Sequence, residues 1–313
     1  MSSGSPLRNA ARAVFHKTGG LDLARWMNRK SLRILMYHRF TDREPLARQC
    51  AHIRAHYSPV SMSQAADWLI HCGQLPENAV AITVDDGYRD FYQVAYPVLR
   101  EYGIPATVYL VSDFIDRGCW LWVDQVQYLF LHTQARNPEL ETPESRKAAA
   151  RSVTESAKKL SNAERLRLLE TLPQQLGVQL PEQAPPACEP LTWDEVRQMA
   201  AAGIEFGAHT RTHPILSRLA SERELRAEIA GSKQRIEQQV GRAVEHFCYP
   251  NGAREDVSPQ VVEAVRAAGF RTAVTTESGL NHVAVDPLRL LRIGVEPGLA
   301  LDYFERCAAG FRV

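Results

Sequence analysis

Short apolar runs rich in valine and isoleucine alternate along the chain with stretches in which apolar residues recur every three or four positions. The short runs predict buried strands, and the periodic stretches predict helices with one face on a core. The predicted strands span residues 33–37, 79–84, 106–111, 203–207, 244–249, 272–275 and 290–295. The predicted helices lie near residues 89–102, 191–202, 221–240 and 258–268.

The helix over residues 221–240 has the clearest start. Ser221 is followed three positions later by Glu224, which matches a capping box, where each side chain accepts a hydrogen bond from the other residue's backbone. Leu225, Ile229 and Ile236 then recur at helical spacing, so one face of this helix is expected to pack on the core.

The repeated order of strand and then helix predicts an α/β protein with a parallel sheet and helices outside it. Both an open doubly wound sheet and a closed barrel satisfy this order. The sequence contains neither G-x-G-x-x-G nor G-x-x-x-x-G-K-[ST], which removes the usual nucleotide-binding reasons for the open form.

The alternation stops between about residues 113 and 190. Residues 120–132 predict one amphipathic helix, and the stretch 144–176, rich in Ala, Glu, Lys, Arg and Leu, predicts one or two more. The proline-rich residues 181–186 then form an extended linker. We interpret this segment as a helical insertion on one loop and not as an independent domain.

Composition narrows the class of protein. With 45% hydrophobic and 23% charged residues, the 313-residue chain resembles an ordinary soluble globular protein. Its formal net charge of +1 offers no field that would attract nucleic acid, so a nucleic-acid partner is not expected. The cysteines are scattered without C-x-x-C spacing, which fits reduced thiols in the cytoplasm.

The first 31 residues are expected to form an N-terminal arm that precedes a domain over residues 32–313. The arm lacks the apolar core and cleavage site of a secretory signal, and no stretch of the chain reaches the roughly 18 apolar residues of a membrane span. Its basic and apolar residues are compatible with a helix on the protein's own core or with a peripheral membrane contact. We therefore expect a cytoplasmic protein, acting on a substrate made at the inner membrane face.

Polar residues follow four of the predicted strands directly. They are His38, the pair Asp85 and Asp86, the stretch 209–213 with a histidine at each end, and the turn 249–252. Because the carboxyl ends of parallel strands share one face, we expect these groups to converge.

Each cluster also has a simpler interpretation. An aspartate after a strand often only caps the next helix, and a loop histidine is often only hydrogen-bonded. Two adjacent carboxylates are harder to explain as caps, because they repel each other unless a metal or a proton is shared. Together the clusters supply one carboxylate and two imidazoles for a catalytic metal, and a second carboxylate that can take a proton from water.

These motifs resemble those of one family. T-V-D-D-G at residues 83–87 resembles T-F-D-D-G, the first motif of the polysaccharide deacetylases (NodB-homology carbohydrate esterases), and H-T-R-T-H at 209–213 matches their second motif, H-[ST]-x-x-H. Residues 247–252 resemble the third. M-Y-H at 36–38 resembles a signature of a bacterial branch that includes poly-N-acetylglucosamine deacetylases. The resemblance covers roughly residues 32–295.

The resemblance implies a distorted (β/α)₇ barrel and hydrolysis of N-acetyl groups on a carbohydrate. Asp85 would be the general base, while Asp86, His209 and His213 would hold Zn²⁺ or a similar divalent ion. The backbone N–H of Tyr249 would stabilise the oxyanion together with the metal.

The sequence lacks two residues of the family pattern, the arginine that orients the base and the histidine that serves as general acid. Many members have an arginine in the third motif that orients the base, but this chain has Phe247 and Cys248 there, and residues 290–295 lack the late histidine that serves as general acid. We expect His38 to replace the acid, although it could instead make only a structural hydrogen bond. Arg292 could pair with Asp85 or bind an anionic substrate group.

Residues 120–124 resemble a W-W-x-D-like element of the same branch. Asp124 is therefore expected to line the sugar cleft, with Trp120 or Trp122 stacking on a ring, unless the tryptophans are simply buried in an amphipathic helix. Two alternatives to a polysaccharide or lipid-linked glycan substrate stay open: hydrolysis of another C–N bond, such as that of a small cyclic amide or ureide, and carbohydrate binding without catalysis.

Overall fold

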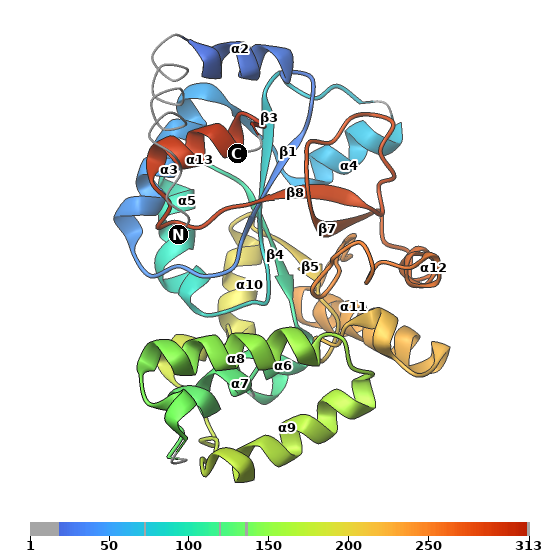
Figure 1. The fold of residues 1–313 in the computed structure, drawn as a ribbon. Helices are drawn as coiled ribbons and strands as arrows, with labels where there is room; N and C mark the ends of the chain where they lie inside the picture. Colours follow the sequence, from blue (N-terminus) through green and yellow to red (C-terminus); the bar gives the residue numbers. More distant parts are fainter. Residues whose placement is uncertain (1–18, 72, 119, 135–136, 312–313) are drawn as a thin grey trace.

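The computed structural model describes residues 19–71, 73–118, 120–134 and 137–311. Seven parallel strands follow one another in the order β1-β8-β7-β6-β5-β4-β3, and β1 pairs with β3 to close the barrel (Figure 1). A short β2 pairs in parallel with the amino end of β3. The strands are β1 (Arg33–Tyr37), β2 (Ser58–Pro59), β3 (Ala79–Val84), β4 (Ala106–Leu110), β5 (Glu205–Ala208), β6 (His246–Cys248), β7 (Thr272–Ser278) and β8 (Leu290–Gly294).

The closed barrel that the resemblance implied is confirmed, and the barrel is distorted as expected. β1 and β3 pair along their whole length, whereas β5 and β6 meet at one residue pair, Ala208 with Phe247. All seven strands predicted from the apolar runs are present. The strands could be predicted because the barrel interior covers one face of each strand and the helices cover the other, so apolar residues are consecutive in the sequence.

Helices surround the barrel, and three more form the insertion. Around the barrel lie α2 (Gly20–Met27), α3 (Arg43–His56), α4 (Met62–His71), α5 (Tyr96–Glu101), α6 (Ser112–Arg117), α10 (Trp193–Ala201), α11 (Glu222–Val240), α12 (Pro259–Ala267) and α13 (Leu301–Ala308). The insertion contains α7 (Trp122–Leu131), α8 (Pro143–Ala157) and α9 (Asn162–Leu176). Short 3₁₀ turns occupy Pro138–Leu140, Pro186–Cys188 and Leu216–Arg218.

Two of the predicted helices are present, but their first turns differ from the prediction. The helix near residues 89–102 begins as a π-helix, Phe91–Ala95, and continues as α5. Pro97 explains this, because it has no N–H to donate to residue 93 in an α-helical pattern. At the start of α11 only half of the capping box forms: Ser221 accepts from the Glu224 N–H, but the Glu224 carboxylate accepts from the N–H of Ala220.

The barrel interior is narrow and packed. Ile34, Ala81, Tyr109 and Val274, each from a different strand, belong to one buried cluster, while alternate residues pack outward against the helices. Gly207 is required here, since a Cβ at this position would stand 2.4 Å from the Tyr109 ring. The filled interior leaves the strand ends as the places where polar groups can gather.

The insertion forms a core of its own. Apolar side chains of α7, α8 and α9, including Val126, Leu129, Ala150 and Leu172, pack on one another. In Figure 1 these helices lie together beyond the carboxyl end of β4. The helical insertion predicted between about 113 and 190 is therefore present, and it sits on the face of the barrel where the polar strand ends converge.

The N-terminal arm is described from residue 19 onward, and the part of the prediction that concerns residues 1–18 lies outside the described residues. Leu21 and Ala24 of α2 pack against Ala309. Trp26 and Met27 on the same helix are exposed. None of the helices in the described ranges is long and apolar enough to span a bilayer.

Candidate active site

Five of the predicted residues meet at the carboxyl ends of the strands. His38 follows β1, Asp85 and Asp86 follow β3, and His209 follows β5 with His213 four residues further on. Asp86 and His213 have positive φ values of 74° and 58°, which residues other than glycine rarely adopt. Such strained backbone persists only where neighbouring contacts enforce it, and it is concentrated at functional sites.

Asp86, His209 and His213 form a compact triad. Oδ1 of Asp86 lies 3.5 Å from Nε2 of His209 and 3.5 Å from Nε2 of His213, and the two Nε2 atoms are 3.2 Å apart. Metal bonds of about 2.0–2.2 Å at tetrahedral angles would separate such ligand atoms by roughly 3.4 Å. Two imidazole nitrogens facing each other also need a proton or a cation between them. The three residues therefore fit a divalent metal.

His209 presents its Nε2 to the triad. Its Nδ1 lies 2.7 Å from the carbonyl oxygen of Cys248 and donates to it, so Nε2 is the ring nitrogen that faces Asp86 and His213. A second group of potential ligands, Asp85, His209 and Cys248, is less suitable. Burial raises the pKa of the Cys248 thiol, so the thiol stays protonated, and Asp85 is already paired.

The two imidazoles titrate differently. Burial and the neighbouring His209 lower the pKa of His213 to about 3, so its ring is neutral. Burial also opposes a charge on His209, but the neighbouring Asp86 carboxylate outweighs it and raises the pKa of His209 well above its ordinary value.

Asp85 is paired with Arg292. Nη1 and Nη2 of Arg292 donate to Oδ1 and Oδ2 of Asp85, both at 2.7 Å, and the arginine side chain is completely buried. Burial alone would raise the pKa of Asp85, but the guanidinium outweighs it and holds the pKa well below its usual range. The carboxylate therefore stays ionised and is held in one orientation.

The geometry leaves Arg292 no donor for a substrate. Its remaining N–H groups face Thr275 O, Thr83 Oγ1 and Cys248 Sγ, so all five of its donors are used. Of the two roles expected for Arg292, pairing with Asp85 matches the structure, and contact with substrate or oxyanion does not. Arg292 is the middle residue of β8, and its side chain is completely buried, so it has no route to solvent.

His38 stands at the open side of the same carboxylate. Its Nε2 is 3.6 Å from Oδ2 of Asp85, beyond hydrogen-bond distance, and its side chain is 45% exposed. The ring therefore faces both the predicted base and solvent. This position suits a proton donor to a departing group, and the acid role stays a prediction.

Tyr249 follows β6 but its polar groups have partners. Its N–H donates to the carbonyl of Val274 at 3.2 Å, and its hydroxyl donates to Leu288 O at 2.9 Å. The oxyanion role of this N–H stays a prediction, and it requires the N–H to be shared with, or released from, Val274.

The tryptophans of the insertion are buried. Trp120 donates through Nε1 to Pro181 O, and Trp122 donates through Nε1 to the carbonyl of His213, both at 3.2 Å. Neither ring is the exposed stacking platform that the resemblance suggested. Asp124 accepts from the hydroxyl of Tyr88 at 2.6 Å, and burial raises the pKa of Asp124 to about 6.

Sequence reasoning missed two residues that contact the site. Cys248 orients His209 with its carbonyl and Arg292 with its sulfur, although it had been noticed only as a departure from the third motif. Arg165 donates to the carbonyl of His213 from α9. No local pattern marks Arg165, because it lies 48 positions from His213 in a surface-type helix.

A buried carboxylate beside three residues that could hold a metal ion is the arrangement found in hydrolases that activate water. A model of the polysaccharide deacetylase family matches residues 73–273, which is more than half of the chain. The chain therefore belongs to the polysaccharide deacetylase family, whose members are hydrolases of non-peptide carbon–nitrogen bonds in carbohydrates.

Relatives that align over most of the chain share only a small fraction of identical residues with it. YxkH of Bacillus subtilis (strain 168), assigned to the polysaccharide deacetylases, is 22% identical over 294 residues, 90% of this chain and 79% of that protein. The poly-beta-1,6-N-acetyl-D-glucosamine N-deacetylase of Escherichia coli (strain K12) is 39% identical over 74 residues, 23% of this chain and 11% of that protein. The structure of IcaB from Ammonifex degensii has a TM-score of 0.62 and 19% identity, covering 90% of this chain and 96% of that chain, which supports the fold.

Proposed function

We propose that the protein is a metal-dependent deacetylase that removes N-acetyl groups from a sugar in a polysaccharide or a lipid-linked glycan. The observation that carries this proposal is the triad of Asp86, His209 and His213, whose ligand atoms are spaced for one divalent ion, with Asp85 beside it. Two nitrogens, one oxygen and space for water are typical of catalytic Zn²⁺.

A divalent metal held by Asp86, His209 and His213 would supply Lewis-acid chemistry, which polarises an acetyl carbonyl and lowers the pKa of water. Asp85 accepts a proton from the attacking water, whose oxygen bonds to the acetyl carbon. Arg292 holds the Asp85 carboxylate in place through two hydrogen bonds. The C–N bond then breaks, acetate leaves, and His38 donates a proton to the departing amine.

The substrate class is inferred from similarity. The 74-residue stretch shared with the Escherichia coli poly-beta-1,6-N-acetyl-D-glucosamine N-deacetylase supports a polymer of N-acetylglucosamine as the first compound to test. The complete set of Asp85, Asp86, His209 and His213 argues against a protein that only binds carbohydrate, because binding alone would not need a base beside a metal site.

The test measures metal content and acetate release from N-acetylglucosamine oligomers. Asp85→Asn should lower kcat by about 10² to 10⁴, the usual value of a general base, and His38→Ala should do so if it is the acid. His282→Ala, a histidine outside the site, serves as the control. Unchanged acetate release in Asp85→Asn would refute the mechanism, while an effect missing only in His38→Ala would remove the acid assignment alone.

A parallel assay with a small cyclic ureide tests the other substrate class. The proposal requires activity on the oligomer and none on the ureide. The reverse result would keep the metal and the base but would assign a different carbon–nitrogen substrate.

A cytoplasmic location and a peripheral membrane contact through the N-terminal arm stay predictions. The exposed Trp26 and Met27 of α2, next to Arg29 and Lys30 in the sequence, support the membrane contact. Fractionation of native cells tests the location: recovery in a periplasmic or secreted fraction would contradict it.

A further inference from the structure

The helical insertion contacts the second histidine of the metal triad. The carbonyl oxygen of His213 accepts two hydrogen bonds, one from Nε1 of Trp122 at 3.2 Å and one from Nη1 of Arg165 at 3.4 Å. Trp122 begins α7 and Arg165 lies in the first turn of α9. Two helices of the insertion, α7 and α9, therefore reach the same backbone atom of a proposed metal ligand.

His213 needs such support because its backbone is strained. Its φ of 58° lies in the left-handed region, which costs a residue other than glycine free energy unless surrounding contacts enforce it. On its amino side the loop is anchored by Glu228, whose carboxylate accepts from the N–H groups of Arg211 and Thr212 at 2.9 Å. The insertion supplies the anchor on the carboxyl side.

The two donors are themselves held in place. Trp122 and Arg165 are both buried, and the guanidinium of Arg165 lies over the Trp122 ring at 5.0 Å. Nη2 of Arg165 also donates to Asn162 at 2.6 Å. Trp122 belongs to the apolar core of the insertion, so the position of both donors depends on how that core packs.

We propose that Trp122 and Arg165 are positioning residues that act through the His213 carbonyl to hold its imidazole at the triad, so that the insertion sets the metal affinity of the site. The inference rests on the proposed metal-dependent function. The imidazole is attached to the same backbone unit, so a change of φ at His213 would move Nε2 away from Asp86 and His209. Contacts behind a metal ligand typically contribute about 10- to 100-fold in metal affinity.

The insertion offers a matched pair of tryptophans for the test. Trp122→Phe removes the N–H that donates to His213, whereas Trp120→Phe removes an N–H that donates at the same distance to Pro181, away from the triad. The dissociation constant of Zn²⁺ or Co²⁺ is measured by competition with a chelator. We expect about a 10-fold or greater weakening for Trp122→Phe and less than about a twofold change for Trp120→Phe.

Arg165 provides a second, independent variant. Arg165→Met keeps much of the packing volume but removes the donor, and it should also weaken metal binding, while Arg165→Lys should restore part of the affinity. The melting temperature of the metal-free protein is measured for every variant. A purely structural role predicts lower melting temperatures with unchanged metal affinity, and that result would overturn the inference.

The outcomes separate the inference from the function on which it rests. If the wild type binds no divalent metal, the proposed metal-dependent function fails. If the wild type binds metal and Trp122→Phe binds it as tightly as Trp120→Phe does, the function stands and the positioning role of the insertion is wrong.

Discussion

Asp85 and Asp86 are neighbours in the chain but face opposite partners. Asp85 lies against the guanidinium of Arg292, while Asp86 lies against the imidazoles of His209 and His213. The positive φ of Asp86 makes this divergence possible, because it turns the chain between the two side chains. In the proposed function, Asp85 would then serve proton transfer and Asp86 would serve metal binding.

Removing Arg292 should leave a buried, unpaired charge. Arg292→Gln is expected to lower the free energy of unfolding at pH 7 by about 3–5 kcal/mol, because the buried carboxylate of Asp85 loses its partner. The double variant Asp85→Asn/Arg292→Gln should recover part of this loss. Urea unfolding of the three proteins measures both effects.

The contribution of Asp85 to the free energy of unfolding should depend on pH in opposite directions in the wild type and in Arg292→Gln. In the wild type the pKa of Asp85 is depressed on folding, so its contribution to stability is present at neutral pH and is lost only as pH falls towards the folded-state pKa. In Arg292→Gln, burial would raise that pKa above its unfolded value of about 3.9. Relative to the double variant, Arg292→Gln should therefore lose stability as pH rises above about 4.

Local motifs predicted the residues of the triad, but they did not predict the contacts that keep the site residues in position. The strand-end positions of Asp85, Asp86, His209 and His213 could be inferred because each follows an apolar run and strand ends share a face. The pairing of Arg292 with Asp85 was one of two alternatives, since only the closed barrel shows that the arginine is inaccessible. The contact of Arg165 with His213 joins distant helices and had no sequence signal.

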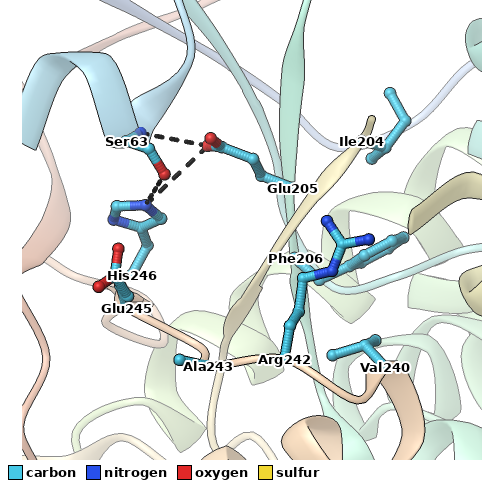
Figure 2. A pocket seen from close by; sticks show the side chains of 9 residues that line it. All are labelled: Ser63, Ile204, Glu205, Phe206, Val240, Arg242, Ala243, Glu245 and His246. Atoms are coloured by element: carbon cyan, nitrogen blue, oxygen red, sulfur yellow. Dashed lines mark hydrogen bonds and ion pairs between the residues drawn. The ribbon is translucent and has the colours of Figure 1, made fainter. Parts of the chain in front are cut away.

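At the scale of elements, the two ends of the barrel carry polar residues of different kinds. The carboxyl end carries the polar triad, whereas at the amino end Glu205 of β5 accepts from the N–H groups of Met62 and Ser63 at the start of α4, at 3.0 and 3.3 Å. Figure 2 shows Glu205 beside Ser63 and His246 in a pocket at this end. The helix dipole favours an anion at this position, so the amino-end cluster is interpreted as a helix cap.

Glu205→Gln should therefore destabilise the fold without changing the chemistry. We expect a loss of about 0.3–2 kcal/mol in the free energy of unfolding, because the neutral amide still accepts hydrogen bonds but lacks the charge that interacts with the helix dipole, with kcat unchanged below the melting temperature. Glu245→Gln is the control, because Glu245 lines the same pocket but pairs with Arg271 near the surface. A loss of activity in Glu205→Gln would contradict the interpretation as a cap.

At the scale of the whole molecule, α2 presents an apolar surface that the barrel does not cover. Trp26 is 60% exposed, and Leu23 and Met27 are exposed beside it. If the arm contacts membranes, the protein should sediment with vesicles that contain anionic lipid, and Trp26→Ser/Met27→Ser should reduce the bound fraction. Val283→Ser, which alters an exposed apolar residue elsewhere, is the control, and equal sedimentation of all three proteins would exclude this contact.

The closure of the barrel has a consequence for synthesis. β1 and β8 are neighbours in the barrel, so His38 near the start of the chain and Arg292 near its end both reach Asp85. The ribosome completes the metal-ligand motif well before it makes β8. A nascent chain that ends before β8 would thus possess Asp86, His209 and His213 and still lack the cation that neutralises Asp85, so only a chain that includes β8 can form the complete site.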